Sequence, residues 1–150
     1  MLISTLRGLK QIWTDLASAL KNLSSYNADS VPSAEGLRFG IVVSEWNTEI
    51  TEALYTGAKE TLLKFGASEK DIIRRNVPGS FELTLGAQLL AERKEFDAII
   101  CIGVVIQGET KHFDFICEAV GQGITNLNIK YNLPVIFGVL TPNTMQQALD

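Results

Sequence analysis

From residue 37 onward, the chain alternates between short runs of consecutive apolar residues and longer segments in which apolar residues recur every three or four positions. The pattern predicts strands over Phe39–Ser44, Asp71–Val77, Ala98–Ile106 and Val135–Leu140, of which Phe39–Ser44 and Ala98–Ile106 are apolar enough to be buried on both faces. The spaced segments predict helices over Thr48–Phe65, about Ser80–Lys94 and about Phe113–Tyr131. Because strands that alternate with helices pair in parallel through right-handed crossovers, we expect an α/β layered sandwich with a four-stranded parallel sheet.

The first 36 residues follow a different pattern. Leucines and one tryptophan recur every three or four positions from Leu2 to Leu23, with charged residues between them, which predicts an amphipathic helix. The charges interrupt any signal-peptide core, and three basic residues against one acidic residue are a weak attraction for anionic lipid. We therefore expect this helix to dock on its own domain or on a neighbouring subunit. Ser24–Gly36 then reads as a polar linker, so the chain divides into residues 1–36 and 37–150.

Composition narrows the classes of partner. A hydrophobic content of 46% in 150 residues suffices for one packed core. The formal net charge of −4 argues against a nucleic-acid-binding role, since phosphates attract clustered Lys and Arg. No apolar stretch reaches the roughly 18–20 residues of a membrane span. The two cysteines, Cys101 and Cys117, exclude a zinc finger and a disulfide framework and fit a reducing cytoplasm.

Some local features have a structural interpretation. Gly66 is a suitable residue to end the first helix, and Ser80 is an ordinary helix N-cap. Thr141-Pro142 predicts the start of a last helix, which reaches Asp150 after about nine residues. A helix that short is marginal in water without packing, so we expect that the sequence is cut off there.

The third helix contains small residues, Gly121 and Gly123, that we interpret as permitting close helix packing. Cys117 in the same helix is interpreted as a small core residue rather than a nucleophile. The sequence holds no GxGxxG or Walker A motif, so it predicts no dinucleotide or nucleoside triphosphate.

Candidate chemistry gathers at the carboxyl ends of the predicted strands, where parallel sheets bind ligands. The residues that follow the four strands are Glu45–Asn47, Pro78–Glu82, Gln107–His112, and Thr141 with Asn143. They include an indole, a phenyl ring, carboxylates and the only histidine of the chain. An apolar slot with a few polar groups is expected there, as for a flat heteroaromatic ligand.

His112 is the strongest candidate for proton transfer, since a histidine normally titrates near pH 6.5. A surface histidine without function is the alternative, but the position at a strand-to-helix junction beside Thr110 favours function. Gly108, Glu109 and Thr110 precede a helix and offer backbone N–H groups to an anion, or simply cap that helix. Phe81 and Trp46 have little core to enter at their predicted positions, which favours a ligand contact for both rings.

Four segments closely resemble the 6,7-dimethyl-8-ribityllumazine synthase family. They are Phe39–Thr51 (FGIVVSEWNTEIT), Asn76–Leu83 (NVPGSFEL), Gly103–Phe115 (GVVIQGETKHFDF) and Pro134–Leu140 (PVIFGVL), and the resemblance covers roughly residues 37–150. It implies a flavodoxin-like sandwich and the condensation of 5-amino-6-ribitylaminouracil with 3,4-dihydroxy-2-butanone 4-phosphate, with loss of phosphate and water. This is the penultimate step of riboflavin synthesis and needs no metal or organic cofactor. The resemblance also implies a homo-oligomer, a pentamer or a 60-subunit icosahedral shell, with sites shared between neighbours.

Carried over by position, the resemblance implies that Trp46 stacks on the pyrimidine and that Ser80, Phe81 and Glu82 contact the pyrimidine and its ribityl chain. The strand end that lies against the same substrate is matched by Val104, Val105 and Ile106.

For the second substrate, the resemblance implies that Glu109 and Thr110 contact the butanone phosphate and that His112 transfers protons. Phe137 matches the aromatic residue that one subunit supplies to its neighbour's site.

Two departures from the family pattern leave three hypotheses open. The family continues past the position of Asp150 with a phosphate-binding arginine, a Gly-Asn-Lys-Gly segment and a long helix, and the leading helix, Met1 to about Ala19, has no counterpart in it. The hypotheses are a lumazine synthase that is active in its full-length form, a non-catalytic shell subunit of the same fold that has lost its phosphate site, and a flavin- or pyrimidine-binding module. The binding module would keep Trp46 and Phe81 but would not need His112.

Overall fold

The computed structural model describes residues 27–150. The chain divides into two compact units, residues 1–31 and 32–150, and the second unit contains the sheet. In the first unit, the described residues form a short 3-10 helix, η1 (Ala28–Ser30), whose first turn is capped by the side chain of Asn27. The predicted leading helix lies outside the described residues.

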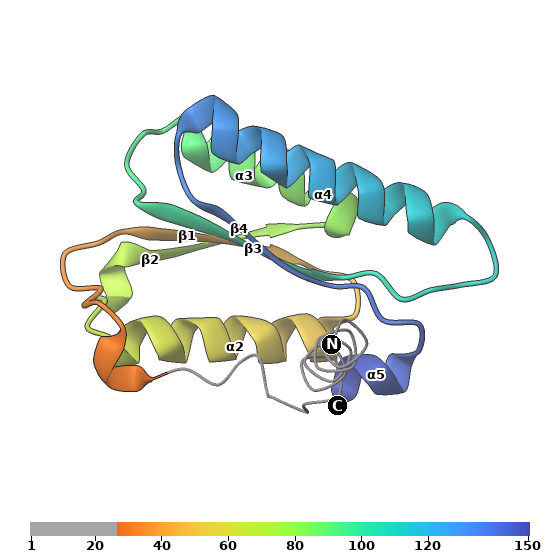
Figure 1. Ribbon diagram of the computed structural model, residues 1–150, viewed down its shortest axis with the longest axis horizontal. Helices are drawn as coiled ribbons and strands as arrows, with labels where there is room; N and C mark the ends of the chain where they lie inside the picture. Colours follow the sequence, from red (N-terminus) through yellow and green to blue (C-terminus); the bar gives the residue numbers. More distant parts are fainter. Residues whose placement is uncertain (1–26) are drawn as a thin grey trace, which may run out of the picture. The chain divides into compact units, whose positions relative to one another are not determined.

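The sheet of the second unit has four parallel strands: β1 (Phe39–Ser44), β2 (Ile72–Val77), β3 (Ala98–Val104) and β4 (Val135–Leu140). Their order is β2-β1-β3-β4, so β1 and β3 are central and β2 and β4 form the edges (Figure 1). Every residue of β1 is buried, as its continuous apolar run predicted. The predicted four-stranded parallel sheet is confirmed.

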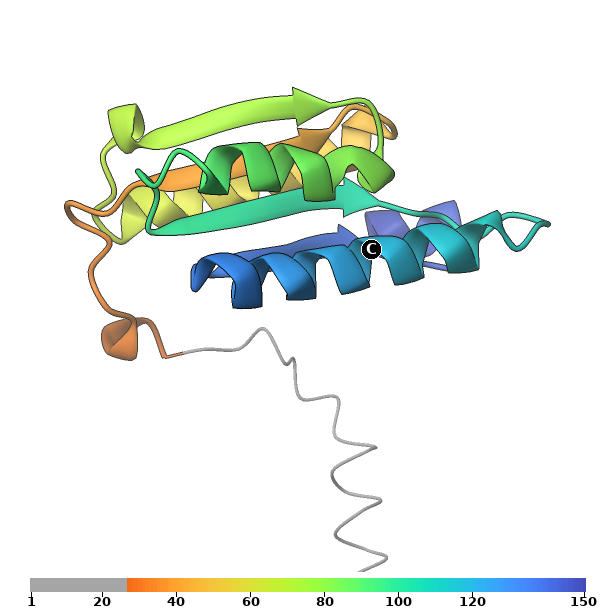
Figure 2. The same ribbon diagram turned by 90° about the horizontal axis from the view of Figure 1, so that it is seen from above.

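Helices cover both faces of the sheet. The helix α2 (Thr48–Lys64) lies on one face, whereas α3 (Leu83–Ala91) and α4 (His112–Tyr131) lie on the other (Figures 1 and 2). One core cluster packs the sheet against α3 and α4, and a second packs it against α2. The last helix, α5 (Met145–Leu149), follows β4. The second unit therefore has three layers, with the sheet between two layers of helices (Figure 1). Among residues 27–150, no helix combines the length and apolarity that crossing a bilayer requires.

Several predicted boundaries are wrong. The strand expected to run to Ile106 ends at Val104, and the helix expected from Ser80 begins with a 3-10 turn, η3 (Ser80–Glu82). The following helix ends before Lys94, because the chain there adopts a left-handed conformation with φ of 54°. The last helix does not start at Thr141.

The start of α5 is set instead by Thr144, whose hydroxyl accepts a hydrogen bond from the N–H of Gln147. The helix is only five residues long. At the end of α2, the prediction is confirmed: Gly66 has a φ of +100° and donates its N–H to the carbonyl of Leu63.

The two glycines of α4 differ. A Cβ at Gly123 would lie 2.5 Å from the hydroxyl oxygen of Thr84 on α3, so this glycine permits close helix packing as predicted. A Cβ at Gly121 would meet nothing within 4 Å in the described residues, so the same interpretation of Gly121 is wrong.

Candidate functional site

A cavity of about 540 Å³ opens at the carboxyl ends of the central strands. The loops after β1 and β2, the residues that end β3 and the first turns of α4 all contribute to it. The lining residues are Trp46, Asn47, Pro78, Gly79, Ser80, Phe81, Glu82, Val104, Val105, Ile106, His112 and Ile116.

The structure brings most of the predicted site residues together. Eight of the eleven line the cavity: Trp46, Ser80, Phe81, Glu82, Val104, Val105, Ile106 and His112. Glu109 and Thr110 are exposed in the loop that precedes α4, outside the lining, and Phe137 lies half-exposed on the edge strand β4. The rings of Trp46 and Phe81 and the imidazole of His112 therefore share one cavity. The loop with Glu109 and Thr110, which was predicted to bind an anion, lies outside its lining.

Trp46 owes its position to backbone contacts. The N–H of Glu45 donates to the carbonyl of Val77 at 2.9 Å, and the N–H of Trp46 donates to the carbonyl of Pro78 at 3.2 Å. A Cβ at Gly79 would lie 3.5 Å from the indole, so the ring rests against this glycine. With 67% of the residue exposed, the indole presents a large surface to a ligand.

The turn after β2 is held by Glu82 rather than by Ser80. The carboxylate oxygen Oε2 of Glu82 accepts a hydrogen bond from the N–H of Gly79 at 3.0 Å. Ser80 is buried, and its hydroxyl donates to the carbonyl of Val104 at 3.2 Å. The prediction that Ser80 acts as the helix N-cap is wrong, because Gly79 occupies that position and the longer Glu82 side chain reaches back to it. Ser80 instead ties the turn to the end of β3.

His112 is the first residue of α4 and is exposed at the cavity wall. Its backbone N–H donates to the hydroxyl oxygen of Thr110 at 3.4 Å, which ties the preceding loop to the helix start, whereas Lys111 occupies the N-cap position. Ile116 lines the cavity one turn further on, and the sequence reasoning missed it. The available signal was spacing, since residues four apart on a helix share a face.

Neither thiol is suited to nucleophilic chemistry. Burial raises the pKa of the Cys101 thiol to about 12, because the thiolate would lie in the core. The pKa of Cys117 is raised by partial burial and by the negative charge of Asp114. Within residues 27–150, no cluster of His, Cys, Asp and Glu side chains could hold a metal ion. The cavity thus offers apolar walls, two rings, one carboxylate and one imidazole.

Residues 36–150 match the family model described as 6,7-dimethyl-8-ribityllumazine synthase. The 6,7-dimethyl-8-ribityllumazine synthase of Cytophaga hutchinsonii is 62% identical over 135 residues, which cover 90% of this chain and 84% of that protein. The protein of the same name from Flavobacterium johnsoniae is 56% identical, and the alignment covers 90% of this chain and 71% of that protein. The one from Parabacteroides distasonis is 54% identical, and the alignment covers 90% of this chain and 84% of that protein. These alignments extend upstream of residue 36.

Proposed function

The chain belongs to the 6,7-dimethyl-8-ribityllumazine synthase family, and we propose that the cavity at the ends of β1 and β3 is its active site. The enzyme is a transferase of riboflavin biosynthesis that condenses 5-amino-6-ribitylaminouracil with 3,4-dihydroxy-2-butanone 4-phosphate, with loss of phosphate and water. The relatives favour this function over a non-catalytic shell subunit or a simple binding module. The observation that supports the assignment of the site is the presence of Trp46, Phe81 and His112 around one cavity.

The pyrimidine binds along the apolar side of this cavity. Its planar ring stacks on the exposed indole of Trp46, and its edge lies against the backbone of Val104–Ile106, at the carboxyl end of β3. Ser80 and Glu82 orient the ring and the ribityl hydroxyls from the turn that follows β2. Stacking on an aromatic side chain contributes about 1–3 kcal/mol for a nucleobase, and a pyrimidine of this kind is comparable.

The phosphate of the second substrate binds beside the cavity, at the start of α4. This helix has 20 residues, so the N–H groups of its first turn carry partial positive charge. Glu109 bears a negative side chain, so its contribution comes from the backbone, together with that of Thr110. An anion held there places the carbon skeleton of the butanone next to His112 and the bound pyrimidine.

His112 transfers protons during the reaction. Schiff-base formation, phosphate elimination and ring closure all move protons, so an imidazole on the cavity wall serves several steps. Holding two substrates against each other supplies much of the remaining rate, because a bimolecular encounter becomes an intramolecular one.

Two substitutions separate binding from chemistry in the full-length gene product. Trp46→Ala should raise KM for the pyrimidine about tenfold to hundredfold, in line with the loss of about 1–3 kcal/mol of stacking, and Trp46→Phe should recover most of it. His112→Ala should lower kcat about 10²- to 10⁴-fold while pyrimidine binding stays intact. Product absorbance reports turnover, and titration of the pyrimidine reports binding. If His112→Ala abolished binding and left the turnover of bound substrate unchanged, the role assigned to this residue would be wrong.

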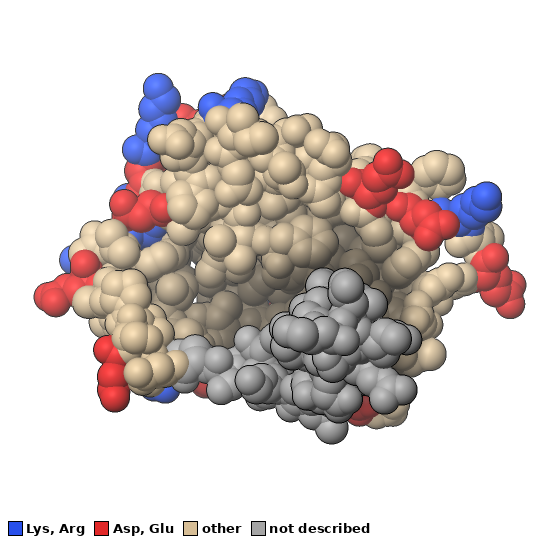
Figure 3. Space-filling model, viewed as in Figure 1, with Lys and Arg blue, Asp and Glu red and all other residues tan. Residues whose placement is uncertain are grey.

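We propose further that copies of this chain assemble into a ring with shared active sites. Phe81 on η3 and Leu85 and Leu89 on α3 form an apolar stripe at helical spacing, with 55–58% of each residue exposed. A second uncharged surface lies on the face of α4 and β4, where charged side chains gather toward the two ends (Figure 3). Ile136 and Phe137 are exposed on β4.

Two different apolar surfaces on one subunit favour a head-to-tail contact, which closes into a ring. A pentamer, alone or as part of a 60-subunit shell, is the assembly that the family resemblance implies. In such a ring, Phe137 reaches the neighbour's cavity.

Mixing two weakened variants tests the shared site. In a mixed ring of Phe137→Ala and Trp46→Ala subunits, some sites combine the native tryptophan of one subunit with the native phenylalanine of the next. These rings should recover activity above that of either variant alone after joint unfolding and reassembly. Without recovery, each site belongs to a single chain. Sedimentation of Leu85→Lys checks the stripe, since a buried lysine should dissociate the ring.

We also infer a cytoplasmic location and partners limited to small molecules and further copies of this chain. Cys101 and Cys117 are unpaired, and they lie on different elements, β3 and α4. Free thiols persist in reducing compartments. The net charge of −4 supports neither nucleic-acid binding nor attraction to anionic membranes.

A further inference from the structure

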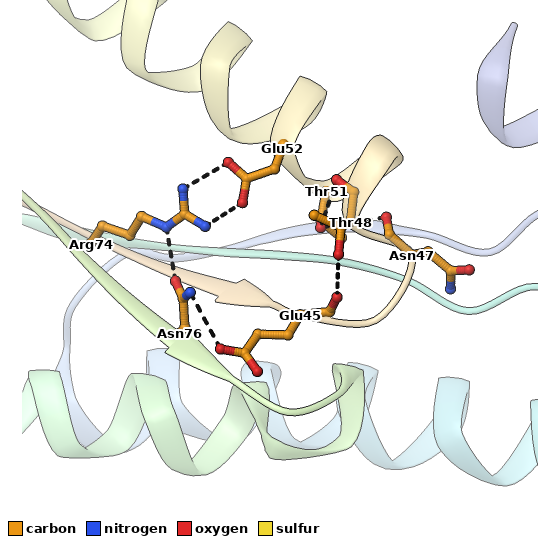
Figure 4. Close-up of polar contacts among 7 residues, drawn as sticks. All are labelled: Glu45, Asn47, Thr48, Thr51, Glu52, Arg74 and Asn76. Carbon is orange, nitrogen blue, oxygen red and sulfur yellow. Dashed lines mark hydrogen bonds and ion pairs between the residues drawn. The ribbon is translucent and has the colours of Figure 1, made fainter.

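A chain of polar contacts joins α2, β2 and the loop that carries Trp46 (Figure 4). Arg74 of β2 lies at its centre. The guanidinium makes a two-pronged contact with the carboxylate of Glu52 on α2, with Nη1 donating to Oε2 at 2.8 Å and Nη2 donating to Oε1. The guanidinium carbon also lies 4.3 Å from the centre of the Tyr55 ring. Arg74 is thus held by both charge and stacking.

The contacts continue from Arg74 toward the cavity. Its Nε donates to the amide oxygen of Asn76 at 2.8 Å, and the amide nitrogen of Asn76 donates to the carboxylate of Glu45 at 3.4 Å. Arg74 and Asn76 lie on the same face of the strand, because side chains two apart in a strand share a face. Asn76 therefore presents its oxygen to a cation and its nitrogen to an anion, which fixes the orientation of its amide.

Glu45 stands directly before Trp46, and its side chain links this loop to the face of β2 that packs against α2. The loop has two further supports: its backbone N–H groups bond to the carbonyls of Val77 and Pro78, and the hydroxyl of Thr48 donates to the carbonyl of Glu45 at 2.8 Å. Since the indole is largely exposed, its orientation depends on how firmly this loop is held.

We propose that Arg74 and Asn76 are positioning residues that hold Trp46 ready to stack on the pyrimidine. Neither residue lines the cavity, so both act through Glu45. The inference rests on the proposed function, in which Trp46 is the stacking surface. Holding the indole in place before the substrate arrives lowers the entropy lost on binding, so the network strengthens binding of the ring and leaves the chemical step alone.

Asn76 is the residue at which the inference is best tested, because substituting it leaves the contact between Arg74 and Glu52 in place. Asn76→Asp keeps an oxygen for Arg74 but sets a second carboxylate against Glu45. Asn76→Leu removes both hydrogen bonds at similar volume. The chain contains two tryptophans, so a Trp13→Phe background leaves Trp46 as the only one.

Both Asn76 variants should raise KM for the pyrimidine about two- to tenfold, the range of one modest hydrogen bond, with kcat changed less than twofold. Acrylamide should quench Trp46 more readily in the free variants than in the parent, and bound pyrimidine should remove the difference. Added salt should reduce the effect of Asn76→Asp, because it screens two like charges, but not that of Asn76→Leu. Arg74→Lys, which keeps the charge and loses the planar fork, should raise KM in the same way.

A matched control is Glu69→Gln, which removes the ion pair with Lys59 further along α2, and it should leave KM and quenching unchanged. Parent values of KM and quenching in both Asn76 variants would overturn the inference, as would a fall in kcat and stability without a change in KM. If Trp46→Ala itself leaves KM unchanged, the stacking role in the proposed function fails. If Trp46→Ala raises KM and the Asn76 variants do not, only the positioning role fails.

Discussion

Replacing Gly123 by alanine should destabilise the protein, although alanine favours helices. A methyl group there would lie 2.5 Å from Oγ1, 2.7 Å from Cγ2 and 3.1 Å from Cβ of Thr84. Thr84 is β-branched and sits in α3, so a rotation that moves one of its two outer atoms away brings the other toward the methyl. The two helices must therefore move apart. The turn that contains Ser80 leads into α3, and His112 is the first residue of α4.

The magnitude follows from two opposing effects. Alanine gains up to about 1 kcal/mol over glycine within a helix, whereas overpacking costs about 1–3 kcal/mol. Gly121 in the same helix is the matched control, since a Cβ there meets nothing within 4 Å among residues 27–150 and only the gain applies. The free energies of unfolding of Gly123→Ala and Gly121→Ala should therefore differ by about 1–3 kcal/mol, with Gly121→Ala the more stable.

Urea unfolding at one fixed protein concentration measures this difference, because association would otherwise shift the apparent stability. Adding Thr84→Ala to Gly123→Ala removes the two nearest atoms and should recover most of the loss. The reasoning would be refuted by a Gly123→Ala protein as stable as Gly121→Ala, or by a double variant no more stable than Gly123→Ala alone.

Three further outcomes are expected. The hydrogen bond from Arg74 lowers the pKa of Glu52, so the pair stabilises the fold above the pKa that Glu52 has in the unfolded chain, and this contribution is lost as pH falls through the pKa in the folded protein. Glu52→Gln should cost less than about 1 kcal/mol near pH 7, and the cost should shrink as pH falls through the acid range; a cost that does not change with pH contradicts this. Burial raises the pKa of Cys101 to about 12, so in Cys117→Ser the remaining thiol should resist iodoacetamide at pH 8 until urea unfolds the protein; rapid labelling of the native form would place Cys101 outside the core. Ser80→Ala leaves the carbonyl of Val104 without its hydroxyl partner and should lower the free energy of unfolding by about 1–3 kcal/mol, whereas unchanged urea midpoints would mean that another group replaces the hydroxyl.

The strand boundaries illustrate what an apolar pattern measures. It located β1 and β4 correctly, because polar or turn-forming residues follow each of these strands directly. It overran β3, since Val105 and Ile106 are as apolar as the strand before them. The ladder stops because β4 ends at Leu140, opposite Val104, after which only the N–H of Val105 reaches a strand carbonyl. An apolar run thus marks either a strand or the wall of a ligand cavity, and here Val105 and Ile106 belong to the wall.

Helix starts were harder to predict, because several residues nearby can accept the same hydrogen bonds. Thr141 and Thr144 both carry a hydroxyl, and only the extended backbone of Thr144 aims its oxygen at the N–H of Gln147. At the start of α3, Ser80 has the expected hydroxyl, but the carboxylate of Glu82 reaches the free N–H of Gly79. The choice depends on backbone dihedral angles, which residue type alone does not determine.

The topology made most of the site predictable, since it places the ends of parallel strands at one edge whatever the details of the loops. The contact between Asn76 and Glu45 needed one more quantity, the register. Val43 pairs with Asn76, so Glu45, two residues later on the same face, comes within reach of the Asn76 amide. That pairing depends on how α2 and the turn after it return the chain to the sheet. In the sequence, Arg74–Asn76 is only part of a predicted strand, and the proposed support for Trp46 depends on the folded register.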